Sequence, residues 1–306
     1  MKYIPYCIYL FTTAIILTLK MHGAAITVLS ISGDVKVKLD AGKPTIQLKF
    51  TTQLTSTSII SIGGNGGYCC LLSNNNTFEY MKPGMYQLNT IDTKSNTKNS
   101  TSGEIILYLQ KSINAKQSKT HYVGSVYRGA PDLSSSFVFP YDTRVLGDTV
   151  NVLWEKDKNV NQYTIVVQSA TQENLLLIPV KDTSKKIVLT ALRNVKRGDC
   201  IYWSVNKNTE TTKQKPFALC WATEIEADSI RNEEKIYRQS RITGDLNPSI
   251  SPIASMLIGT WYEKRGYFAE ALKYYDNAEL LLKQNNIPPA EQYRNAKTSL
   301  LARLGK

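Results

Sequence analysis

The hydrophobic period of the chain changes once, and this change limits the folds that the chain can adopt. From residue 26 to about residue 226, short runs of alternating apolar and polar residues, such as DVKVKLD, are separated by turn residues. This alternation predicts β-strands with one buried and one exposed face. From Ala227 onward the apolar residues recur every three or four positions, which predicts helices. A β-rich part is therefore expected to precede a helical part.

The first 25 residues have the pattern of a secretory signal peptide. Lys2 precedes an apolar run over residues 4–19, and the small residues at positions 23–25 follow it. The run is shorter than the roughly 20 residues that a membrane-spanning helix needs. We expect cleavage after Ala25 and an exported chain that is periplasmic or associated with the cell envelope. An uncleaved anchor is the alternative.

Charge and histidine content exclude several kinds of site. The 306 residues include 37 Lys plus Arg and 25 Asp plus Glu, a net charge of +12, but the basic residues are dispersed and form no run typical of a nucleic-acid patch. They are expected to aid solubility or to attract the chain loosely to an anionic envelope component. Of the two histidines, His22 lies inside the expected signal peptide, which leaves His121 for any histidine-based centre. We therefore expect no catalytic residue, no metal and no cofactor.

Two short motifs suggest chemistry but favour simpler roles. The glycine-rich run 63–67 lacks the Gly-Lys-Ser/Thr of a phosphate loop and precedes a strand, so we expect a hairpin turn. Cys69 and Cys70 are adjacent, and in a strand they point to opposite faces, which prevents a two-ligand metal clip. A nucleophile pair with His121 is conceivable. One buried and one partly exposed thiol is the simpler expectation.

The first β-rich segment resembles a module found outside the cytoplasmic membrane of bacteria. Its Gly-Asp-Val opening, basic-apolar strand and glycine turn are followed by an Asn-rich turn and an aromatic strand that ends near Pro-Gly. This order resembles the FecR-type β domain. We assign residues 26–135 to it, with a helix near 104–117. The family contains regulators of envelope signalling, so the resemblance implies an exported module.

Residues 142–226 form a second strand-rich segment. It contains six expected strands, with Trp154 on an early one and Tyr202-Trp203-Ser204-Val205 on a later one. The pattern resembles a fibronectin type III or immunoglobulin-like sandwich, in which an inward Trp is a core residue. Such modules have seven strands, so a further strand is expected within 136–140.

The last hairpin of this segment brings two cysteines together. A loop centred near residue 210 places Cys200 directly across from Cys220. Opposite residues of an antiparallel pair lie within the reach of a disulfide. The two open alternatives are this disulfide and a pair of buried free thiols.

Residues 227–306 are expected to be helical, and SMLIGTWYEKRGYFAEALKYYDNAELLLKQ resembles a tetratricopeptide (TPR) repeat. The match rests on small residues at the close-packing, turn and second-helix positions of the repeat, namely Gly259, Gly266, Ala271 and Ala278. The family binds peptides or protein segments on its concave face. By that resemblance, the candidates for contact with a partner protein are Tyr262, Tyr267, Lys273 and Tyr274, although Tyr262 would serve equally as a core residue.

The expected fold class is multidomain α+β: two β-rich domains, FecR-like and immunoglobulin- or fibronectin-like, followed by a TPR-like helical domain over 227–306. One repeat cannot bury its own face, so the preceding helix, the sandwich or a partner must cover it. The expected function is a non-catalytic, exported envelope scaffold or adaptor that binds a protein partner through the helical end. No nucleic acid or small-molecule cofactor is implied. The alternative is a FecR-like sensor or regulator subunit in envelope signalling.

Overall fold

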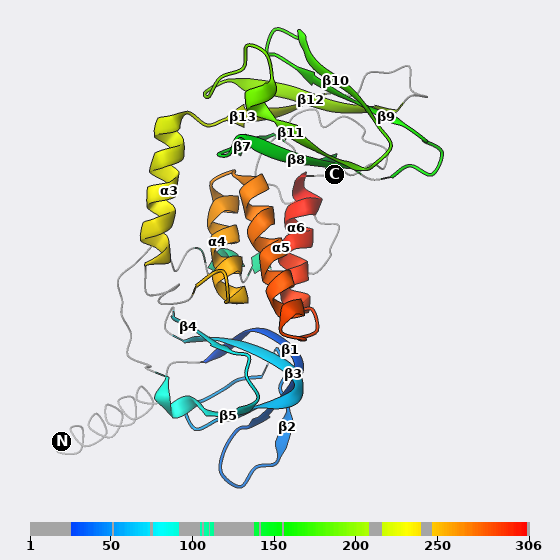
Figure 1. Cartoon of the computed structure of the whole chain (residues 1–306). Coiled ribbons are helices and arrows are strands. Elements are labelled where there is room, and N and C mark those ends of the chain that lie inside the picture. Colours follow the sequence, from blue (N-terminus) through cyan, green and yellow to red (C-terminus); the bar gives the residue numbers. More distant parts are fainter. Residues whose placement is uncertain are drawn as a thin grey trace, which may run out of the picture. The chain divides into compact units, whose positions relative to one another are not determined.

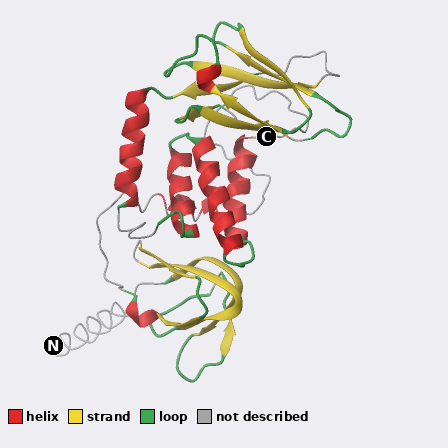
Figure 2. Ribbon diagram, in the orientation of Figure 1, coloured by secondary structure: helices red, strands yellow, loops and turns green. Residues whose placement is uncertain are grey.

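The computed structural model describes residues 26–50, 52–73, 76–91, 105, 107–109, 111–112, 138–140, 142–154, 156–207, 216–239 and 247–304. The chain divides into two compact units, residues 1–99 with 286–288 and residues 100–285 with 289–306. Among the described residues more lie in strands than in helices, and Figures 1 and 2 show where the two kinds of element lie along the chain. The expected signal peptide and His121 lie outside the described residues.

In the first unit, two long strands form the centre of a sheet. β1 (Thr27–Lys38) pairs antiparallel with β3 (Ile59–Ser73). Burial alternates over 35–38 of β1 and 59–62 of β3, whereas 28–30 and 67–71 are buried without a break. The described strands follow the order β2-β1-β3-β4, and β5 also pairs with β3. The remaining elements are β2 (Thr45–Gln47), β4 (Asn76–Tyr80), β5 (Gly84–Gln87) and the short 3-10 helix η1 (Leu88–Thr90).

The glycine-rich run 63–67 lies inside β3 and does not form the expected hairpin turn. Gly33 on β1 has φ +73° and pairs with Gly67, and the register shifts just after it. A Cβ atom on Gly33 would lie 2.2 Å from the carbonyl oxygen of Gly66. Because the two backbones approach so closely, the glycines permit a bulge in a continuous strand pair, where a turn was expected.

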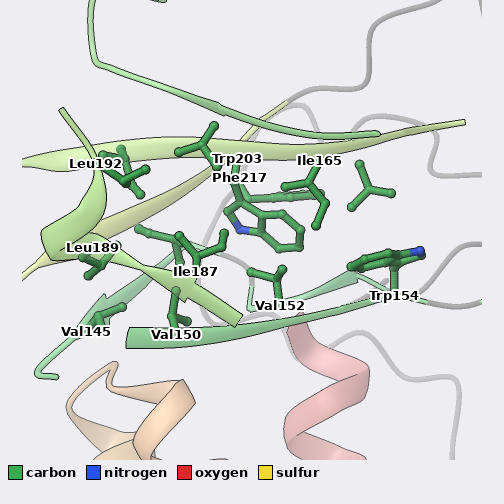
Figure 3. Packing of buried hydrophobic residues seen from close by; sticks show 14 of the residues in the cluster. Val145, Val150, Val152, Trp154, Ile165, Ile187, Leu189, Leu192, Trp203 and Phe217 are labelled. Atoms are coloured by element: carbon green, nitrogen blue, oxygen red, sulfur yellow. The ribbon is translucent and has the colours of Figure 1, made fainter. Parts of the chain in front are cut away.

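In the second unit, two sheets face each other across one hydrophobic core (Figure 3). One sheet has the order β10-β9-β12-β13-β7 and the other the order β11-β8-β6. β6 lies within 136–140, where the sequence predicts a further strand. The elements are β6 (Val138–Phe139), β7 (Thr143–Val145), β8 (Thr149–Trp154), β9 (Tyr163–Gln168), β10 (Asn174–Val180), β11 (Ser184–Val188), the 3-10 helix η2 (Leu189–Ala191), β12 (Cys200–Lys207) and β13 (Phe217–Trp221).

Trp203 on β12 lies inside this core and is fully buried. Figure 3 shows its indole between the two sheets, near Phe217. The two ring centroids are 5.8 Å apart, and the indole N–H donates to the carbonyl oxygen of Pro140 at 3.1 Å. Trp154 is also buried in the core, as expected. Both tryptophans are therefore structural residues.

The helices begin at capping residues. The Thr223 hydroxyl accepts a hydrogen bond from the backbone N–H of Glu226, which starts α3 (Glu224–Arg238) earlier than the expected Ala227. Glu224 and Glu226, expected at a strand end, therefore lie in the first turn of a helix. Ser251 caps α4 in the same way, and Gly266 turns the chain with φ +80°. The other bounds are α4 (Pro252–Lys264), α5 (Phe268–Gln284) and α6 (Glu291–Leu304).

The helices belong to the second unit together with its two sheets. The carbonyl oxygen of Gly266 accepts hydrogen bonds from the Arg144 backbone N–H at 3.2 Å and from the Thr143 hydroxyl at 2.9 Å. Described helical residues between 105 and 112 also belong here, since the Tyr108 hydroxyl donates to Glu263 at 2.7 Å. The helix expected in the first β module is thus attached to α4.

The expected fold class is therefore wrong. It required two β-rich domains followed by a separate TPR-like helical domain, whereas the chain is β-rich, with several sheets and a C-terminal helical region, and divides into two units. The physical reason is that a short helical hairpin with an apolar face needs a cover. The strands that precede it along the chain supply part of that cover.

Glu270, near the start of α5, is a buried carboxyl at the contact between helices and sheets. Its Oε1 accepts a hydrogen bond from the Leu146 backbone N–H at 3.2 Å, and Oε2 has no partner among the described residues. Burial raises the pKa of Glu270, because removal of the carboxylate from water outweighs the attraction of Lys273 and the backbone N–H groups. The ionised carboxylate therefore destabilises the folded unit.

We predict that Glu270→Gln stabilises the second unit at neutral pH. The folded carboxyl holds its proton more tightly than the unfolded one, so wild-type stability falls as the pH rises above the ordinary pKa of Glu. The amide keeps an acceptor for Leu146 without the charge, and we expect a gain of about 1 kcal/mol, or ~2–4 °C in melting temperature, at pH 7.5. Thermal unfolding at pH 7.5 and pH 4 measures the change in melting temperature relative to the wild type.

The gain in melting temperature should shrink at pH 4. The control Glu173→Gln, at an exposed site, should leave the melting temperature unchanged at both pH values. An equal gain for Glu270→Gln at the two pH values contradicts the prediction.

Candidate protein-binding site

The helices α4 and α5 cross at a glycine. A Cβ atom on Gly259 would lie 2.6 Å from the ring of Tyr275 and 3.1 Å from the carbonyl oxygen of Ala271. Ala271 and Ala278 are fully buried on α5. The small side chains thus let the two helices approach closely, and the turn at Gly266 makes them a hairpin.

One face of this hairpin is lined by large side chains. We call it the aromatic face; it consists of Trp261, Tyr262, Arg265, Tyr267 and Tyr274. The rings of Tyr262 and Tyr274 are stacked with centroids 5.6 Å apart, and the Arg265 guanidinium lies 3.9 Å from the centre of the Trp261 ring. Helix α3 supplies the groups that contact this face.

Glu234 of α3 lies between two tyrosines of the aromatic face. Its Oε2 accepts a hydrogen bond from the Tyr262 hydroxyl at 2.6 Å, and its Oε1 accepts one from the Tyr274 hydroxyl at 2.7 Å. Arg238, one turn further along α3, forms an ion pair with Glu234 and donates to the Tyr274 hydroxyl at 2.7 Å. The carboxylate thereby joins α3 to both helices of the hairpin.

The charge state of Glu234 follows from these contacts. Partial burial opposes ionisation, but the hydrogen bonds from Tyr262, Tyr274 and Arg238 outweigh it and lower the pKa of Glu234. Burial, together with the bond to Glu234, raises the pKa of Tyr274 to about 12. At neutral pH a carboxylate therefore accepts from two neutral phenols.

The two ends of α3 make further contacts. At its start, Glu226 accepts a hydrogen bond from the Tyr267 hydroxyl at 2.6 Å and forms an ion pair with Arg144 of β7. Burial and the bond to Glu226 raise the pKa of Tyr267 to about 12. Near its end, the Tyr237 ring stacks on Trp261 with centroids 6.0 Å apart. Between these ends, Arg265 donates to Glu233 at 3.2 Å.

The four expected partner-contact residues have different environments. Tyr262 and Tyr267 are only 4% and 2% exposed, and their hydroxyls are used by α3, so they are not the exposed contacts that the resemblance implies. Tyr274 is half-buried and also binds α3. Lys273 is exposed. The physical reason is that α3 of the same chain already covers the aromatic face.

Sequence reasoning missed the acidic side of this site. In the sequence, Glu226 ends the expected strand-rich segment, and Glu233 and Glu234 are consecutive carboxylates beside Lys235 on an expected helix, a pattern typical of a solvated face. The available signal was helical spacing, since Glu226, Glu234 and Tyr237 are eight and then three positions apart and share one side of a helix. Carboxylates do not by themselves indicate what lies opposite, so only the structure pairs them with tyrosines.

The cysteines occupy two different environments. Cys200 and Cys220 are opposite each other on β12 and β13 and form a disulfide. Cys69 and Cys70 are both fully buried in the first unit, where one partly exposed thiol was expected. Burial raises the pKa of Cys69 to about 12 and also raises that of Cys70, which disfavours the thiolate that a nucleophile needs.

Metal-binding groups and membrane-spanning helices are both absent from the described residues. The described part of the chain holds no group of three or more His, Cys, Asp or Glu side chains that could bind a metal ion. Within the same ranges, no helix is both long and apolar enough to cross a membrane. Neither a protein-family model nor a curated protein sequence matches the chain.

Proposed function

We propose that the chain is a non-catalytic adaptor, exported to the cell envelope after removal of residues 1–25, that binds a partner protein through its helical end. The observation that carries the proposal is the aromatic face. It combines Trp, Tyr and Arg side chains, the residue types that dominate the binding energy of protein interfaces. It also holds a helix through side-chain hydrogen bonds, which supports a role in binding helical protein segments.

Other features fit a binding role better than catalysis. The buried carboxyls Glu263 and Glu270 contact groups of the same unit, and the buried thiols have raised pKa values. The excess of basic residues supports a second, looser attraction to an anionic envelope component.

A site-specific photo-crosslinker tests the adaptor function. We expect a crosslinking residue at the exposed position Lys273 of the full chain to capture a discrete protein in the intact envelope. The same residue at Lys186, which is exposed on β11, is the control and should capture none. Equal capture at both positions, or none at either, contradicts the proposal. Deletion of the helical end is a poor test, because Gly266 and Glu270 bind the β7 region of the same unit.

A further inference from the structure

Helix α3 is held to its unit by few buried side chains. Of its 15 residues, all described by the structure, only Ala227 and Tyr237 are buried. Ile225 and Ile236 are 85% and 64% exposed. A helix held by core packing buries a continuous apolar stripe. The attachment of α3 therefore depends mainly on part-buried side-chain hydrogen bonds and on the stacking of Tyr237 against Trp261, in place of a continuous apolar stripe.

The charge of α3 is opposite to that of the chain as a whole. Its sequence, EIEADSIRNEEKIYR, has five acidic and three basic residues, which gives 3 − 5 = −2, whereas the chain has a net charge of +12. The aromatic face offers it hydroxyl and guanidinium donors, from Tyr262, Tyr274 and Arg265. The face and the helix are electrostatically complementary, which favours binding specificity.

The contacts of α3 define a short recognition pattern. Glu226 and Glu234 are eight residues apart, about 12 Å along a helix, and Tyr237 follows three residues later. Glu226 contacts Tyr267, Glu234 contacts Tyr262 and Tyr274, and Tyr237 stacks on Trp261. Every residue of the aromatic face contacts either this pattern or, as for Arg265, the neighbouring Glu233.

We propose that the aromatic face is the binding site for an acidic helical segment of a partner protein, and that α3 occupies this site until the partner displaces it. This inference rests on the adaptor function proposed above and specifies the chemistry of its partner. The partner segment has two carboxylates eight residues apart and an aromatic residue three positions further on. Because α3 competes for the same groups, only molecules in which α3 has left the aromatic face can bind the partner. The apparent affinity for the partner is therefore the intrinsic affinity multiplied by the fraction of such molecules.

A helical peptide with the α3 sequence serves as the probe. It spans residues 223–238, and a covalent link between positions 228 and 232, both exposed in α3, keeps it helical, since a free peptide of this length is marginally helical in water. The full chain is used as wild type and as Glu234→Gln, which weakens α3 but leaves the aromatic face unchanged. Asp228→Asn is the matched control, because Asp228 pairs with Arg231 of α3 itself.

We expect the labelled peptide to bind Glu234→Gln at least tenfold more tightly than wild type or Asp228→Asn. A peptide with Gln at the position of Glu234 should lose about tenfold in affinity for the opened chain. When Tyr262→Phe and Tyr274→Phe are added to the Glu234→Gln chain, its tighter binding of the peptide should be lost, since both hydroxyl donors are then absent. Equal binding to the Glu234→Gln and Asp228→Asn chains, or no binding to any chain at 100-fold excess of peptide over protein, overturns the proposal.

Hydrogen exchange supplies a second readout that does not need the peptide. In Glu234→Gln the amides of α3 should exchange faster, while those of α4 and α5 remain protected. Faster exchange in all three helices would indicate general destabilisation and would overturn the idea of a separable α3. Failure of the peptide with continued capture at Lys273 removes this inference and leaves the adaptor function. Peptide binding without any envelope capture removes the adaptor function and leaves only the ability of the aromatic face to bind an acidic helix.

Discussion

Trp203→Ala should reduce the free energy of unfolding of the second unit by about 4 kcal/mol, the largest effect that we expect from a single substitution in this chain. The substitution empties the centre of the core between the two sheets and removes the contact with Phe217. It also leaves the Pro140 carbonyl oxygen without the indole donor. Urea unfolding followed by circular dichroism measures the change.

The neighbouring residue supplies the matched control for this prediction. Tyr202 lies on the same strand but on the other face of the sheet and is partly exposed. Tyr202→Ala should cost less than about 1 kcal/mol. Similar losses for the two substitutions would mean that the core does not centre on Trp203.

Removal of the Cys200–Cys220 disulfide should destabilise the same unit by about 3 kcal/mol. The bond closes a loop with a sequence separation of 20 residues, and its loss lets the unfolded chain gain conformational freedom. Both cysteines are partly exposed, so a reductant can reach them. We expect the urea midpoint of the wild type to fall on reduction to that of the Cys200→Ala/Cys220→Ala variant.

The double variant is its own control. Cys69 and Cys70 are free thiols in the described structure, so the reductant should not change the midpoint of the double variant further. If the wild-type midpoint is the same with and without reductant, the disulfide contributes nothing to stability and the prediction is wrong.

Local patterns predicted many of the elements. Alternation located β8 to β13 of the second unit, including the partners β12 and β13 that place Cys200 opposite Cys220. The strand β6 was expected from the strand number of the sandwich that the segment resembles, and β7 was not predicted. Small residues located the crossing of α4 and α5 at Gly259. These predictions succeeded because each depends on residues close in sequence or on the register of one hairpin.

The errors have two causes, a contact between distant segments and a local cap that was not recognised. The run 63–67 was expected to be a turn, since glycine favours turns, but Gly33 lies opposite it and makes it a bulge. Glu224 and Glu226 continued an alternating pattern, and the Thr223 cap that starts a helix there was not recognised. At the glycine run the pairing with Gly33 on another strand selected the structure, whereas at Glu224 and Glu226 the deciding signal was the local cap from Thr223.

The sequence by itself determined that a β-rich part precedes a helical part and that Cys200 lies opposite Cys220, because short-range periodicity and hairpin register specify such features. The glycine crossing was expected from the TPR resemblance, and the sequence is compatible with either a disulfide or two free thiols. Only the tertiary structure decided that the helices share a unit with two of the sheets and that α3 covers the aromatic face. A carboxylate on a helix is compatible with water or with a tyrosine. The position of the opposing element decides between them, and sequence spacing does not contain that position.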